Sequence, residues 1–138
     1  MAFEATGAGE ALLAGRILFA AVLGFLAVGN LQDVDETVAY AASKGAPVPR
    51  LTVPLASLAL VAGAVSILLG AFPLLGSLAV VGFLVGVTPV MHDFWSQEGM
   101  DRQNEQIHFL KNVGLAGGAL VFAALATTTW PYAVGLTI

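Results

Sequence analysis

The chain has 138 residues, of which 58% are apolar and only 10% are charged, and its net charge is −4. This composition is far from that of soluble domains and is typical of an integral membrane protein. The five cations form no patch for phosphates, which argues against nucleic-acid binding, and the lack of cysteine excludes disulfides, iron–sulfur clusters and Cys-based zinc sites.

Four apolar segments are long enough to cross a bilayer: residues 11–29, 51–70, 74–95 and 107–126. Residues 51–92 contain no Asp, Glu, Lys or Arg, and these 42 residues as helix would extend about 63 Å, roughly twice the hydrocarbon thickness of a membrane. A buried soluble hairpin is the alternative, but so short a chain lacks the polar helices needed to cover it. We therefore expect a single all-α domain, an integral membrane antiparallel four-helix bundle.

Arg16 interrupts the first span about one turn after its start. We expect its guanidinium to snorkel to the lipid headgroups while its aliphatic stem stays in hydrocarbon. The alternative is that Arg16 faces the bundle and caps backbone carbonyls or an acidic side chain there.

The connection at residues 30–50 is predicted to hold a short interfacial helix, because Val34, Val38 and Ala41 recur at helical spacing among acidic residues. Pro54 should lie in the first turn of the second span, and Pro89 should kink the third span and turn His92 toward the fourth. Small residues four apart, which let membrane helices pack closely, are Ala59 and Gly63, Gly82 and Gly86, and Gly114 and Gly118.

Most of the polar chemistry lies between residues 91 and 120. If residues 101–120 are helical, one arc of about 120° carries Asp101, Asn104, Glu105, His108, Lys111 and Asn112. Trp130 and Trp95, interpreted as interfacial anchors, place this polar stripe at one membrane surface. We predict one hydrogen-bonded cluster there, whose ligand-binding or proton-handling candidates are His92, Asp93, His108, Lys111 and Asn112. The supporting candidates are Asn30, Gln32, Trp95, Asn104, Glu105 and Arg16.

The cluster allows several kinds of chemistry. Two histidines and a carboxylate can in principle bind a metal, but their spacing is not diagnostic, so we expect histidines that hydrogen-bond helix ends and no metal site. No catalytic residue is assigned, because the sequence has no nucleophile turn and no haem, iron–sulfur or zinc ligand set. Lys111 either snorkels or is neutralised by Glu105 or Asp93.

Three functions stay open for such a site. The headgroup of a quinone resides at this depth, where His or Lys donors can bind its carbonyls and Asp93 can exchange protons with water. In the second interpretation the chain is a non-catalytic scaffold, whose acidic and amide-rich rim docks a soluble redox enzyme. The third is a small-solute carrier, although four spans without a charge at mid-membrane offer little to couple transport to. At most, we expect the chain to be the membrane subunit of an oxidoreductase and not a stand-alone enzyme. The sequence also allows the chain to form a homo-oligomer.

Several motifs resemble the DoxX family of small four-span membrane proteins. They are Gly15–Arg16, Thr37–Tyr40, Lys44–Pro47, Gly70, His92–Trp95 and Gln103–Asn112. The resemblance implies a membrane partner of soluble or membrane-bound oxidoreductases, since relatives include a subunit of a thiosulfate:quinone oxidoreductase. Two departures are Leu60, where the family often has an acidic residue, and residues 30–33, which lack the usual lysine.

The cations predict the orientation in the cell membrane. Lys44, Arg50, Arg102 and Lys111 lie in the two connections of one side, whereas the opposite side has only Arg16. Because cytoplasmic loops are enriched in Lys and Arg, we expect these connections in the cytoplasm and both termini outside.

Overall fold

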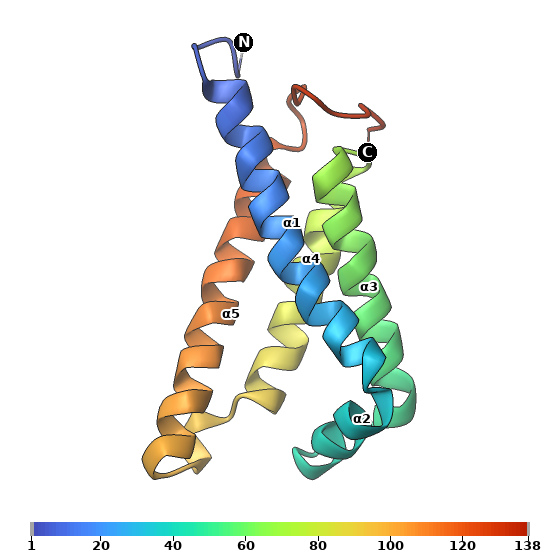
Figure 1. Ribbon diagram of the computed structural model, residues 1–138, viewed down its shortest axis with the longest axis vertical. Coiled ribbons are helices and arrows are strands. Elements are labelled where there is room, and N and C mark those ends of the chain that lie inside the picture. Colours follow the sequence, from blue (N-terminus) through green and yellow to red (C-terminus); the bar gives the residue numbers. More distant parts are fainter. Residues whose placement is uncertain (1, 138) are drawn as a thin grey trace.

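Four long helices lie side by side, and a short helix crosses one end of them (Figure 1). The computed structural model describes residues 2–137. Its helices are α1 (Ala8–Gln32), α2 (Val34–Ser43), α3 (Pro49–Leu69), α4 (Pro73–Met91), the single-turn 3-10 helix η1 (Phe94–Ser96) and α5 (Gly99–Leu125). Because α1, α3, α4 and α5 alternate in direction and the described residues contain no strand, the predicted all-α antiparallel bundle is confirmed, with α2 in the connection expected to hold a short helix.

The outward faces of the bundle are suited to lipid. Each of the four long helices has the length and hydropathy needed to cross a membrane. Large apolar side chains on their outer faces are open to the surroundings: Phe25 is 83% exposed, Leu18 69% and Val85 65%. A soluble monomer rarely exposes so much contiguous apolar surface, whereas acyl chains cover it without cost. The bounds of the spans within the bilayer stay a prediction.

α3 and α4 form a tight hairpin. Gly70 ends α3 in the left-handed conformation, at φ 65°, and α4 begins with Pro73. Farther along, a Cβ atom added to Gly63 would lie 2.6 Å from a methyl of Val80 and 2.8 Å from the carbonyl oxygen of Gly76, so only glycine allows this approach. The turn between the two helices spans only residues 70–72.

The small-residue pairs pack closely at only some positions. Gly63 contacts α4, and an added Cβ on Gly118 would lie 2.9 Å from the Phe19 ring. By contrast, a Cβ on any of three other glycines of these pairs would meet nothing within 4 Å: Gly82, Gly86 and Gly114. The packing role expected for those three is wrong within one copy of the chain, because no other element that the structure describes lies in contact with these positions.

Pro54 occupies a position that differs from the prediction, and the helix that contains Pro89 ends earlier than expected. α3 begins at Pro49, so Pro54 lies in the second turn and not in the first, and Pro49 takes the favourable position at the helix start. Pro89 lies in the last turn of α4, which ends at Met91 instead of continuing to Trp95. The chain therefore changes direction at His92.

The segment after α5 folds back onto the bundle near the start of α1 (Figure 1). Trp130 is only 6% exposed, its Nε1 donates a hydrogen bond to the carbonyl oxygen of Leu125 at 2.9 Å, and its ring packs against Phe122. The expectation that Trp130 anchors the fourth span at the lipid headgroups is wrong, because its side chain points into the core. It belongs to the core at the end of the bundle opposite α2.

Candidate functional site

A cluster of polar side chains forms where α4 turns into α5, at the end of the bundle that α2 crosses. α4 ends at Met91, and the N–H of His92 donates to the carbonyl oxygen of Thr88 at 3.0 Å. The His92 ring then faces α5: its Nδ1 lies 2.7 Å from Glu105 Oε2, and it stacks on the His108 ring with 5.2 Å between centroids. The prediction that His92 turns toward the polar stripe is confirmed.

Residues from the α2 side complete this cluster. Lys44 Nζ lies 2.7 Å from Asp93 Oδ1 and 3.9 Å from Glu105 Oε1. The Tyr40 hydroxyl donates to the same Glu105 oxygen at 2.9 Å, and Ser96 Oγ donates to Asp93 Oδ2 at 2.6 Å. Two partly buried carboxylates are thus paired with side chains from three different elements, and these contacts fix α2 to the turn between α4 and α5.

The contacts keep both α2-side donors protonated. The hydrogen bond to Asp93 raises the pKa of Lys44 above its ordinary value, although burial acts in the opposite direction. Burial raises the pKa of Tyr40, and the hydrogen bond to the Glu105 carboxylate raises it further. Lys44 remains a cation and Tyr40 a neutral phenol throughout the neutral pH range.

Neither Tyr40 nor Lys44 was predicted as a site residue, although both occur in the motifs that resemble the DoxX family. Tyr40 lies on α2 and Lys44 directly follows its end, and their spacing of four residues, about one helical turn, is the signal that was available. The polar face of a short interfacial helix ordinarily points to water, and only the placement of α2 against α3 and the α4–α5 turn directs it elsewhere.

A cavity of about 470 Å³ lies between α1, α2, α4 and α5, beside the cluster. Its polar wall consists of Asn30, Asp33, Glu36, Thr37, Tyr40, His92, His108, Lys111 and Asn112. Its apolar wall consists of Leu23, Leu26, Leu60, Phe83, Leu84, Val87 and Met91, with Gly29 beside them. Figure 1 shows α1 and α5 diverging toward this end of the bundle. The polar residues lie toward the end of the bundle that α2 crosses and are called the mouth of the cavity, whereas the apolar residues lie mostly deeper in the bundle.

The structure brings most of the predicted candidates together. Asn30, His92, His108 and Lys111 line the cavity, as does Asn112, which is 6% exposed and donates from Nδ2 to the Thr88 hydroxyl at 3.1 Å. Asp93 and Glu105 do not line the cavity themselves. They lie in the adjoining cluster, where Glu105 holds His92 and Asp93 holds Lys44.

Three of the supporting candidates lie apart from the cavity. Gln32 ends α1 and is exposed, and Asn104 is exposed on α5 next to Glu105. Trp95 packs edge-on against the Phe94 and Phe109 rings, with centroid distances of 5.3 and 5.9 Å, and does not contact the cluster. Trp95 is exposed, whereas Phe94 and Phe109 are half-buried.

Arg16 lies at the opposite end of the bundle and does not support this site. It is fully buried, and its guanidinium donates to four carbonyl oxygens: those of Ile67 at 3.1 Å, Leu68 at 2.6 Å, Pro131 at 2.9 Å and Tyr132 at 3.2 Å. The expected snorkelling is wrong, and the alternative, that Arg16 caps carbonyls within the bundle, is confirmed. The last carbonyls of α3 lack partners within the helix, and a buried cation requires such acceptors.

No group of three or more His, Asp or Glu side chains within residues 2–137 is arranged to hold a metal ion. His92 and His108 stack face to face, and the nearest carboxylate to His92 is already bonded to Tyr40. Within the cluster these side chains act on one another as hydrogen-bond donors and acceptors.

Comparison with known proteins agrees with this architecture. The DoxX family model matches residues 11–93, so the polar stripe of α5 lies beyond the matched range. The inner membrane protein YphA of Escherichia coli (strain K12) is 35% identical over 127 residues, which cover 91% of this chain and 86% of that protein. No solved structure matches the chain. With four membrane-length helices and these two similarities, the chain is a multi-pass membrane protein that belongs to the DoxX family.

Proposed function

We propose that this protein binds the headgroup of a quinone in the cavity between α1, α2, α4 and α5, as the membrane component of a quinone-linked oxidoreductase system. The observation that carries the proposal is the division of the cavity wall into a polar mouth and an apolar interior. A quinone is divided in the same way, since its ring carbonyls are polar and its tail is not. The cavity volume, about 470 Å³, lies within the range of about 300–1,000 Å³ that is usual for small-molecule sites.

The donors at the mouth fit the carbonyls of such a ring. Lys111 and the two histidines line the cavity, and each can donate a hydrogen bond to a carbonyl oxygen. Glu105 holds His92 through Nδ1, which fixes the orientation of the ring. An imidazole oriented by a carboxylate is suited to proton transfer at neutral pH.

The roles of chain and partner follow from this chemistry. Reduction of a quinone takes up electrons and protons together, and quinol oxidation releases both. The side chains of this protein would bind the ring and pass protons between it and water, and a partner oxidoreductase with its own redox group would exchange the electrons.

Two glycines of α1 provide a matched test of the site. A Cβ added to Gly29 or to Gly24 meets nothing within 4 Å, but only Gly29 lines the cavity. The variant Gly29→Leu should therefore fill the mouth without displacing a neighbour, whereas Gly24→Leu extends into open space elsewhere on the helix. We expect wild type and Gly24→Leu to retain quinone when membranes are solubilised and extracted, and Gly29→Leu to lose it. Equal quinone content in a folded Gly29→Leu protein would refute the proposal.

A second variant tests proton handling separately from binding. His92→Gln keeps a side chain able to donate to Glu105 but removes proton exchange near neutral pH. We expect quinone to remain bound while quinone-linked activity in membranes falls and loses its pH dependence around neutrality. A normal rate and pH profile would assign His92 a purely structural role.

A scaffold function is the second candidate, and one feature favours it. The first turns of α5 present exposed polar side chains that take no part in the cavity wall: Asp101, Arg102, Gln103, Asn104 and Gln106. If this surface only docks a soluble redox enzyme, Gly29→Leu should keep both the partner and its activity. Substitution of Asp101 and Arg102 together should then release the partner on purification.

A further inference from the structure

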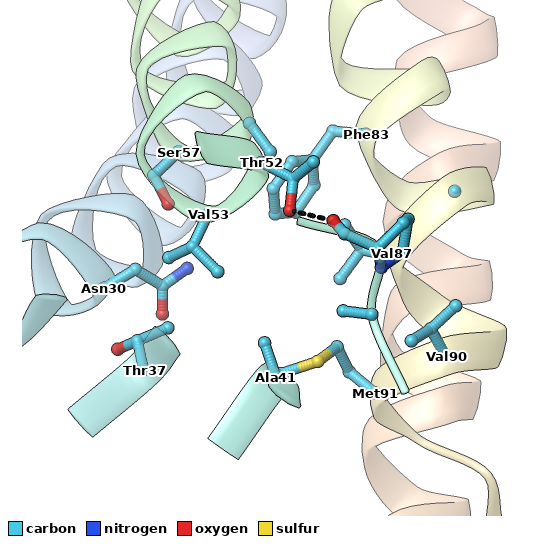
Figure 2. Close-up of a pocket in the computed structure, with 14 residues that line it drawn as sticks. Asn30, Thr37, Ala41, Thr52, Val53, Ser57, Phe83, Val87, Val90 and Met91 are labelled. Atoms are coloured by element: carbon cyan, nitrogen blue, oxygen red, sulfur yellow. Dashed lines mark hydrogen bonds between the residues drawn. The ribbon is translucent and has the colours of Figure 1, made fainter. Parts of the chain in front are cut away.

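A second cavity, of about 260 Å³, adjoins the first between α2, α3 and α4 (Figure 2). Val53 and Ser57 of α3 line one side of it, and Val87 and Val90 of α4 line the other. Five residues line both cavities and form the boundary between them: Asn30, Thr37, Phe83, Val87 and Met91. The two spaces therefore meet at these residues, which belong to α1, α2 and α4.

The second cavity has an almost entirely apolar surface. Alanine, valine, proline and methionine side chains form most of its wall. Two of its polar groups are already bonded to the backbone: Thr52 Oγ1 donates to the carbonyl oxygen of Pro47 at 2.9 Å, and Thr37 Oγ1 donates to that of Asp33 at 3.0 Å. These threonines have no need of a ligand as an acceptor, and such a space favours hydrocarbon over water.

We propose that the second cavity holds the first part of the hydrocarbon tail of the ligand whose headgroup occupies the larger cavity. This inference rests on the proposed function and narrows its ligand to quinones that carry a prenyl tail. An apolar cavity of about 150 Å³ takes up a six-carbon ring, so about 260 Å³ holds on the order of ten carbons, or about two prenyl units. The remainder of a longer tail would leave toward lipid past Gly86, which is exposed and lines the cavity.

The tail should determine where the ligand lies in the protein more than how tightly the ligand binds. A prenyl chain in a membrane is already surrounded by hydrocarbon, so its transfer to an apolar cavity gains packing contacts but little hydrophobic free energy. Its location in the protein is therefore the informative quantity. The competing route runs between the diverging helices α1 and α5, past Leu23 and Leu26 of the larger cavity.

Photolabelling locates the tail directly. The probe is a quinone with two prenyl units and a diazirine at the end of its tail, bound to the purified full-length protein in lipid nanodiscs. We expect the label on residues that line only the second cavity, such as Val53 and Val90, and we expect excess tail-less quinone to displace it. Gly86→Leu should fill the second cavity and reduce this labelling several-fold. Its control is Gly82→Leu, since Gly82 also has no neighbour within 4 Å but lines neither cavity.

Each of three other labelling results would refute a particular part of this proposal. Label on Leu23 or Leu26, with the headgroup still bound, overturns the tail assignment and leaves the proposed function intact. Label in the second cavity that tail-less quinone does not displace, but excess phospholipid does, assigns that space to a lipid acyl chain and also overturns the inference. Absence of quinone binding in wild type refutes the proposed function itself.

Discussion

Replacing Arg16 by methionine should strongly destabilise the bundle, and the structure allows an estimate of the loss. Methionine keeps an apolar stem, but the four carbonyl oxygens of α3 and the C-terminal segment lose their donor. A hydrogen bond to a charged group contributes about 1.5–3 kcal/mol, so four independent ones would give about 6–12 kcal/mol. The substitution also removes the burial cost of the cation, which is several kcal/mol, so we expect a net loss of about 3–5 kcal/mol.

Trp130 reports on this site, because its ring lies 5.5 Å from the Arg16 guanidinium. In a Trp95→Phe background, Arg16→Met should shift Trp130 emission to longer wavelength and lower the denaturant midpoint of the solubilised protein. Arg16→Lys, which has fewer donors, should be intermediate. The control is Arg50→Met, since Arg50 is exposed at the other end of the bundle and should change stability by less than about 0.5 kcal/mol. Equal midpoints and equal Trp130 emission in the Arg16→Met and Arg50→Met variants would show that the carbonyl bonds contribute no net stability.

Three further measurements test other features. Gly63→Ala should lower stability by about 1–3 kcal/mol, because its Cβ would meet a side chain and a backbone oxygen of α4, whereas Gly82→Ala should not; equal thermal unfolding would contradict the close approach. With the other tyrosine replaced, absorbance titration should give Tyr40 a pKa above the ordinary 10.0. The hydrogen bond from Tyr40 to Glu105 of α5 should therefore persist at pH values below the raised pKa and be lost as the pH rises through it. An impermeant maleimide should label Ala2→Cys in intact cells but Ala42→Cys only after lysis, and the reverse would invert the proposed orientation.

The helices were predictable because a chain segment that crosses a lipid bilayer is restricted to helical structure when it is not part of a barrel. In hydrocarbon every backbone group must be bonded within the segment, so long apolar runs without charge form helices whatever their neighbours are. The turn between α3 and α4 follows from Gly70 and Pro73, whose backbone preferences are local. The contact of His92 with α5 was also predictable, since a short turn joins two antiparallel helices and places their adjoining polar residues together.

The partners of charged side chains were not predictable, because they depend on distant segments. Arg16 fits either a lipid headgroup or a helix end, and the choice is made by carbonyls about 50 and 115 residues away in sequence. Lys44 was counted only as a cation for orientation, although it pairs with Asp93 at a separation of 49 residues. Sequence periodicity identifies the face of a helix and not the element that covers it.

The two ends of the bundle differ in a way that makes the cavity possible. At one end Arg16 bonds α1 to the last turn of α3 and to the C-terminal segment, and the buried Trp130 ring packs beside its guanidinium, so these three segments are held together. A bundle fastened there can let α1 and α5 diverge at the other end without losing its core (Figure 1). Polar side chains can gather in the opening because helix ends bring them within reach of water, and α2 covers it through Tyr40 and Lys44. The buried cation therefore supports the cavity only through the fold, while the residues that line the cavity lie at the other end of the bundle.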